Sequence, residues 1–210
     1  MRPGGLTVTE QALAYCDLHP GMRALDVGCG TGKSLRQMTD THQLAGIGID
    51  TSANLIRQAR GSSASLRFAQ ANGQTLPFAT QSMDLLLSEC TLSMFQMERA
   101  LAEYTRVLKQ RGFLVINDVY ARKEEGVPFL LELPPESCIG GAMPERVILE
   151  GIKRCGLRLI VFQDCSAHLK EFPICNLSNA SGLSSFDLFL AAAKAKLGYY
   201  FLVAQKVSDE

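Results

Sequence analysis

Residues 25–32 have the sequence Leu-Asp-Val-Gly-Cys-Gly-Thr-Gly, and the prediction of the fold rests mainly on this segment. It joins a short apolar segment, residues 23–27, to a segment of helical character that begins at Lys33. Glycines are needed in such a turn where a ligand approaches the backbone closely or where φ is positive. A strand, a glycine-rich turn and a helix in this order predict the ligand-binding end of an open α/β sheet.

The next strand strengthens this interpretation. Residues 44–49 are apolar and end at Asp50, whose carboxylate can accept hydrogen bonds from two ribose hydroxyls. A nucleoside-containing cofactor is therefore expected. Gly28, Gly30 and Gly32 are spaced as G-x-G-x-G, whereas dinucleotide folds typically present G-x-G-x-x-G. This spacing alone does not identify the cofactor.

Strands and helices continue to alternate beyond this unit, and Ser52 can cap the helix after Asp50. Further strands are predicted at residues 65–70, 83–88, 113–118, 157–163 and 199–206, and helices at 7–19, 33–39, 96–109, 144–155 and 185–197. Gly112 is expected at the C′ position of the helix 96–109. Continuous apolar strands such as residues 85–87 predict a parallel sheet covered on both faces.

Composition limits the class of protein. The chain has 210 residues, 21 basic and 21 acidic side chains and 47% hydrophobic residues, which fits one globular domain and excludes disordered or collagen-like chains. Neither half carries excess charge, so nucleic-acid or membrane partners are not expected. No signal peptide or apolar span is visible, and the seven cysteines contain no C-x-x-C pair. A soluble, cytoplasmic protein without a disulfide framework or zinc ribbon is expected, and its oligomeric state stays open.

Residues 22–118 resemble the class I S-adenosylmethionine-dependent methyltransferases, particularly the small bacterial type 11 proteins. The likeness rests on residues 25–32, on Leu-Pro-Phe at 76–78 followed by Met-Asp-Leu at 83–85, and on residues 198–206, which resemble the family's final antiparallel strand. It implies a Rossmann-like seven-stranded, mostly parallel sheet with helices on both faces and the last strand antiparallel. It also implies S-adenosylmethionine as cofactor and S-adenosylhomocysteine as product.

The resemblance assigns the cofactor contacts residue by residue. Asp26 and the backbone of the turn would surround the methionine part, Asp50 and Thr51 the ribose, and Ser88 the sulfonium region. Asn72 departs from the acidic residue that the family commonly uses for the adenine amino group, although its side-chain oxygen can still accept. The full predicted set is Asp26, Gly28, Cys29, Gly30, Gly32, Asp50, Thr51, Ala71, Asn72 and Ser88.

Catalytic candidates are fewer, because a methyl on a cationic sulfur is already activated and mainly needs positioning. Glu89 is either a general base or a solvated loop acid, and His168 is either a base or a surface residue. Asp84 is interpreted as structural. No Asp/Asn-Pro-Pro-aromatic motif follows the fourth strand, which argues against methylation of nucleic-acid bases.

The segment Cys-Ile-Gly-Gly-Ala at 138–142 resembles part of the arsenite methyltransferases. A metalloid site using Cys90, Cys138 and either Cys165 or Cys175 is therefore an alternative, because thiolates suit soft centres. The same cysteines are equally well interpreted as small core residues.

The sequence thus predicts one methyltransferase domain over residues 1–210, with a core of about 20–120. Residues 1–19, 121–143 and 166–198 are expected to close over a small-molecule acceptor. Alternatives are a metalloid methyltransferase and a non-catalytic interaction module of the same fold, with a nicotinamide dehydrogenase as a weaker option.

Overall fold

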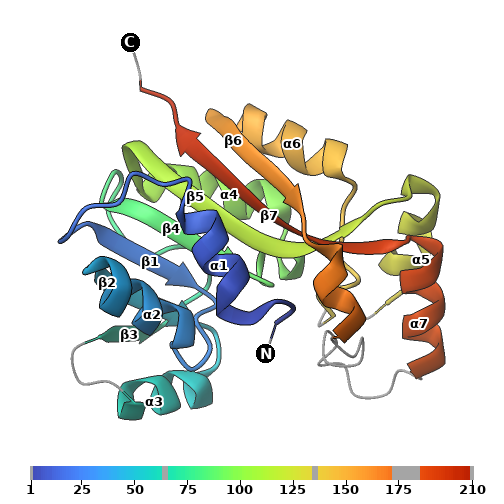
Figure 1. The fold of residues 1–210 in the computed structure, drawn as a ribbon, viewed down its shortest axis with the longest axis horizontal. Helices are drawn as coiled ribbons and strands as arrows, with labels where there is room; N and C mark the ends of the chain where they lie inside the picture. Colours follow the sequence, from blue (N-terminus) through green and yellow to red (C-terminus); the bar gives the residue numbers. More distant parts are fainter. Residues whose placement is uncertain (1, 63–65, 134–136, 172–184, 209–210) are drawn as a thin grey trace.

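Seven strands form one sheet in the computed structural model, which describes residues 2–62, 66–133, 137–171 and 185–208. The sheet order is β3-β2-β1-β4-β5-β7-β6 (Figure 1). The strands are β1 (Arg23–Val27), β2 (Ala45–Asp50), β3 (Arg67–Gln70), β4 (Met83–Glu89), β5 (Leu108–Ala121), β6 (Leu157–Asp164) and β7 (Leu197–Lys206). Strands β1 to β5 pair in parallel, whereas β7 is antiparallel to both β5 and β6. The predicted Rossmann-like class is confirmed.

Helices cover both faces of the sheet. Figure 1 shows α1 (Gly5–Leu13) and α2 (Lys33–His42) in front of it, and α4 (Met97–Val107) and α6 (Glu145–Arg154) behind it. Helix α3 (Ala53–Ser62) shares the core of α1 and α2. Leu85 and Leu87 of β4 face that core, whereas Leu86 faces the core of α4 and α6. Because successive strand residues point to opposite faces, a strand buried on both sides is apolar throughout.

Several predicted boundaries differ from the structure, and two of them have a clear local cause. Helix α1 ends at Leu13 rather than at residue 19, because the amide of Cys16 donates to the Leu13 carbonyl oxygen and the chain turns. Gly112 does not cap α4. That helix ends at Val107, and Leu108 takes an extended conformation to start β5, so Gly112 lies inside the strand.

The connections beyond β5 hold more structure than the sequence predicts. Residues 121–143 contain a 3-10 turn, η2 (Glu124–Gly126), and the short helix α5 (Val127–Leu131), which contacts α7 (Ser185–Lys194). Another 3-10 segment, η3 (Ser166–Glu171), follows β6. Residues 172–184 of the predicted substrate-closing segment lie outside the described residues. Within the described ranges, no helix has both the length and the apolar character that a membrane crossing requires.

Candidate functional site

The turn after β1 has the backbone geometry that its glycines predict. The φ angle is 75° at Gly28, 53° at Gly30 and 77° at Gly32, in the left-handed region that side chains rarely adopt. The amides of Gly28 and Cys29 donate to one carbonyl oxygen near the end of β2, at 2.8 and 2.9 Å. A Cβ on Gly28 would collide with the side chain of Thr91, whereas nothing lies within 4 Å of a Cβ built on Gly30. The turn is therefore open on the Gly30 side.

Asp50 lies directly beside this turn, at the end of β2. Its Oδ2 accepts the amide of Gly30 at 2.9 Å, and its Oδ1 accepts the amide of Ser52 at 2.8 Å. Each carboxylate oxygen has a second lone pair, so Asp50 can still accept two hydroxyl groups. Thr51 is exposed next to it. The predicted pairing of the glycine turn with Asp50 is present in the structure.

Asp26 is buried beneath the turn, with 2% of its surface exposed. Burial, reinforced by the neighbouring carboxylate of Glu89, raises the pKa of Asp26 from 3.8 to about 8. The amide of Leu35 donates to this carboxyl group, but its Oδ2 has no hydrogen-bond partner among the described residues. A buried carboxyl oxygen without a donor fits a positively charged group of a ligand.

The segment after β3 lies alongside Asp50, because the amide of Ala71 donates to the Asp50 carbonyl oxygen at 3.1 Å. The side chain of Asn72 behaves differently from the prediction. Its Oδ1 accepts the amide of Gln74 at 2.9 Å, which closes a local turn. The side-chain amide nitrogen, rather than this oxygen, is therefore the group that Asn72 presents most readily to a ligand.

Ser88 and His168 do not join this group. Ser88 is fully buried, and its hydroxyl lies 3.3 Å from the hydroxyl of Tyr104 on α4, because residues 86 and 88 of β4 face the same core. This geometry does not support the predicted contact of Ser88 with a sulfonium. His168 lies in η3 with its ring beside Gly4. Neither side chain is brought to the glycine turn.

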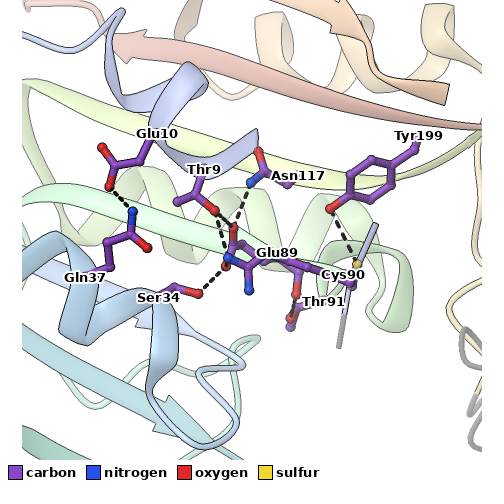
Figure 2. A network of polar contacts seen from close by, with 10 residues as sticks. Thr9, Glu10, Ser34, Gln37, Glu89, Cys90, Thr91, Asn117 and Tyr199 are labelled. Carbon is purple, nitrogen blue, oxygen red and sulfur yellow. Dashed lines mark hydrogen bonds and ion pairs between the residues drawn. The ribbon is translucent and has the colours of Figure 1, made fainter. Parts of the chain in front are cut away.

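Glu89 is the centre of a polar network rather than a free base (Figure 2). It ends β4 and is 9% exposed. Four side chains donate to it or pair with it: Thr9 at 2.6 Å, Ser34 at 2.5 Å, Asn117 at 2.7 Å and Arg2 at 3.0 Å. Because its oxygens are occupied by donors from α1, α2 and β5, this geometry argues against the predicted general base and gives Glu89 a structural role.

The cysteines are brought together only in part. Cys90 and Cys138 interact, since Cys138 contributes to the raised pKa of the Cys90 thiol, although burial is the main cause. Cys165 lies at the end of β6, and Cys175 lies outside the described residues. Over the described parts of the chain, no cluster of three or more metal-ligating side chains is present.

A cavity of 740 Å³ lies next to the segment that follows β4 and beside the end of β5, and the sequence does not predict it. It is lined mainly by apolar side chains of η1 (Leu92–Met94), α4, β5, residues 131 and 133, and residues 140–148. The deepest apolar members include Leu92, Met97, Val119, Leu133, Ile148 and Tyr200. The signal that could have revealed it is the run Leu-Ser-Met-Phe at 92–95, which places three large apolar side chains shortly after a strand end.

One buried carboxylate lines this cavity. Asp118 is 1% exposed, and burial raises its pKa from 3.8 to about 6. It accepts the amide and the hydroxyl of Ser93 at 2.9 and 2.8 Å, and its own strand neighbour Val119 donates an amide at 2.8 Å. These bonds hold the segment that follows β4 against β5, so Asp118 shapes the cavity wall.

The cavity adjoins the glycine turn through one short segment. Thr91 contacts the position of a Gly28 Cβ, and the next residues along the chain line the cavity. Phe95, at the end of the same segment, and Val27, at the end of β1, both lie against Gly73. Residues 91–95 therefore separate a polar, glycine-lined site from an apolar cavity that can hold a second small molecule.

The part of the chain that contains the glycine turn, Asp50 and the segment 91–95 matches a known protein family. Residues 25–116 match the family model described as a methyltransferase domain. This match covers a little under half of the chain, so it shows a likeness to the methyltransferase domain over these residues. The matched residues include the glycine turn, Asp50 and the segment 91–95, which are the parts of the site described above. The predicted family resemblance is confirmed.

The names of two curated relatives of this chain refer to different acceptor atoms, oxygen in one and nitrogen in the other. It is 27% identical to the O-methyltransferase resE of Aspergillus sclerotiorum, over 95% of this chain and 81% of the relative. It is 33% identical to phosphoethanolamine N-methyltransferase 1 of Triticum aestivum, over 55% of this chain and 24% of the relative. It also spans about half, 51%, of a Haemophilus influenzae relative. These likenesses do not select an acceptor.

Solved structures share the fold of this chain. Geranyl diphosphate methyltransferase in complex with S-adenosylmethionine superposes with a TM-score of 0.77 at 16% identity, covering 96% of this chain and 85% of that one. The [4+2]-cyclase SpnF superposes with a TM-score of 0.72 at 21% identity, covering 97% and 81%. At such identities the likeness concerns the fold, which does not by itself fix a reaction.

Proposed function

We propose that this protein transfers a methyl group from S-adenosylmethionine to a small-molecule acceptor. The observation that carries the proposal is the glycine turn itself: positive φ at Gly28, Gly30 and Gly32, beside Asp50 and above the unpartnered oxygen of Asp26. This set fits a ligand that combines a ribose with a cationic amino-acid end. When bound, S-adenosylmethionine supplies a methyl group on a positively charged sulfur.

The residues of the turn bind and orient in this proposal. Asp50 accepts the ribose hydroxyls with its free lone pairs, and Asp26 faces the ammonium group. Ala71 and Asn72 border the adenine, with the side-chain amide nitrogen of Asn72 as the available donor. The open side of Gly30 gives the ligand access to the backbone.

The acceptor occupies the 740 Å³ cavity, which favours a small and largely apolar molecule. Asp118 accepts hydrogen bonds from Ser93 and Val119, so it holds the cavity wall in place. Leu131 of α5 lines this cavity, so α5 lies at its edge and would border the bound acceptor.

A thermal-shift comparison tests the proposal. S-adenosylmethionine and S-adenosylhomocysteine at about 100 times Kd are expected to raise the apparent stability by about 2.7 kcal/mol through mass action, and NAD is expected to have no effect. A shift with NAD alone would favour a dehydrogenase. A shift without methyl transfer across a panel of apolar acceptors would favour a non-catalytic module.

A metalloid acceptor is a second candidate, favoured by the interaction of the Cys90 and Cys138 thiols. Thiols in the same neighbourhood suit a trivalent, thiophilic centre. On this candidate, Cys138→Ser abolishes methylation of arsenite and leaves the affinity for S-adenosylhomocysteine unchanged. A wild-type protein that does not methylate arsenite would remove the candidate.

A further inference from the structure

Three buried polar atoms around Glu89 have no hydrogen-bond partner among the residues that the structure describes. They are Oδ2 of Asp26, Oδ1 of Asn117 and Nε of Arg2. Asp26 and Asn117 are 2% and 0% exposed, and the Arg2 side chain is 16% exposed. Because buried polar groups are normally paired, three such atoms close together need an explanation.

Glu89 fixes the orientation of two of these side chains. Its Oε2 lies 3.0 Å from Nη2 of Arg2, and its Oε1 accepts Nδ2 of Asn117 at 2.7 Å. The same Arg2 nitrogen donates to the hydroxyl of Thr9 at 2.8 Å. One nitrogen of the guanidinium and the nitrogen of the amide are thus used, and Nε of Arg2 and Oδ1 of Asn117 are left over.

The unused atoms have complementary chemistry. Asp26 and Asn117 offer acceptors, and Arg2 offers a charged donor. Asp26 and Arg2 also interact electrostatically, which places them in the same neighbourhood of the glycine turn. An α-amino acid group carries an ammonium that donates and a carboxylate that accepts, so it matches both kinds of unused atom.

We propose that Arg2 and Asn117 complete the cofactor site at its amino-acid end. The Arg2 guanidinium binds the carboxylate of S-adenosylmethionine, and Asn117 Oδ1 accepts from the ammonium together with Asp26. Glu89 is then a positioning residue that holds both side chains. This inference rests on the proposed function, because it concerns the same cofactor, and it gives the segment before α1 a direct role in binding.

Calorimetric titration with two ligands tests the inference. S-adenosylhomocysteine carries the amino-acid end, whereas 5′-methylthioadenosine keeps the adenosine and lacks that end. Arg2→Gln is expected to weaken S-adenosylhomocysteine binding by about tenfold or more, while 5′-methylthioadenosine affinity stays within about twofold. Arg146→Gln is the matched control, since Arg146 is an exposed arginine on α6 that pairs with Glu150, and it should change neither affinity.

The outcomes of this titration distinguish a failure of the inference from a failure of the proposed function. Equal effects of Arg2→Gln on both ligands, no effect, or tighter S-adenosylhomocysteine binding would overturn the inference and leave the proposed function in place. A wild-type protein that binds neither ligand would overturn both. Normal 5′-methylthioadenosine binding shows that the variant is folded, and Arg2→Lys, which keeps the charge but not the planar pair of donors, should recover only part of the affinity.

Discussion

The two halves of the site are built in different ways. On the cofactor side, the glycine turn closes onto Asp50 through a bond between residues 20 positions apart, and both belong to one strand-helix-strand unit. On the acceptor side, the cavity is assembled from residues 74, 92–99, 118–119, 131, 133, 140–141, 143, 147–148 and 200. The first half is therefore specified by local sequence, and the second by the packing of distant segments.

The two halves of the site also differ in the chemistry of the groups that line them. The cofactor side presents backbone amides, the carboxylate of Asp50 and other buried ionisable groups. The acceptor cavity, in contrast, is lined mostly by apolar side chains. A binding site for one invariant ligand can be encoded in a short motif. A site that varies with the acceptor depends on connections, which tolerate change. The comparison predicts that variants on the two sides affect different steps.

The largest effect is expected at the turn. Gly28→Ala forces a side chain into positive φ and against Thr91, so the free energy of unfolding should fall by about 2 kcal/mol or more and S-adenosylhomocysteine binding should be lost. Gly61→Ala in α3 meets no atom within 4 Å and should be neutral or slightly stabilising. Denaturant unfolding measures both. Equal behaviour of the two variants would remove the special role of the turn.

On the acceptor side, Met143→Asp introduces a charge into the apolar cavity. Methyl transfer to an apolar acceptor should fall by about tenfold or more, because the charge must be desolvated, while the affinity for S-adenosylhomocysteine stays within about twofold. Kinetics and calorimetry on the same preparation separate the two effects. If the variant loses cofactor affinity instead, the division between the halves is wrong.

Asp26, on the cofactor side, makes the stability of the protein depend on pH. Its pKa is raised from 3.8 to about 8, so the folded protein binds more protons than the unfolded chain between these values. Its contribution to stability is complete below pH 3.8 and is lost as the pH rises through about 8. Relative to Asp26→Asn, the wild type should therefore lose about 1 kcal/mol or more between about pH 6 and pH 9. Urea unfolding at both pH values measures this difference, and parallel profiles would contradict it.

The smallest effect is expected at Asp84, which lies at the opposite end of β4 from the site. Its carboxylate pairs with Lys109 at 2.8 Å and accepts the amide of Arg23 at 2.9 Å. Asp84→Asn should cost about 0.5 to 1 kcal/mol of stability, because such partly exposed pairs are weak, and should leave ligand affinity unchanged. A clear loss of S-adenosylhomocysteine binding would show that the structural interpretation of Asp84 is wrong.

The sequence predicted the half of the site that depends on local geometry. Strand β1 has the predicted bounds, and the three glycines and Asp50 meet as expected. Ser88 was misplaced because strand alternation turns it toward Tyr104, a packing choice that a family motif does not record. The oxygen of Asn72 is used by a local turn, and the network around Glu89 needs α1 to fold back onto β4. The cavity could not be predicted, since it exists only once residues 131–133 and 140–148 pack beside η1.

The central claim is that a ribose-bearing ligand lies across the glycine turn, held by Asp50. Calorimetric titration of S-adenosylhomocysteine into the wild type, Asp50→Asn and Asp40→Asn tests it most directly, because Asp40 is an exposed carboxylate on α2. The account predicts binding to the wild type and to Asp40→Asn, and affinity about tenfold or more weaker for Asp50→Asn. Equal affinity of all three proteins, or no binding by the wild type, would contradict it.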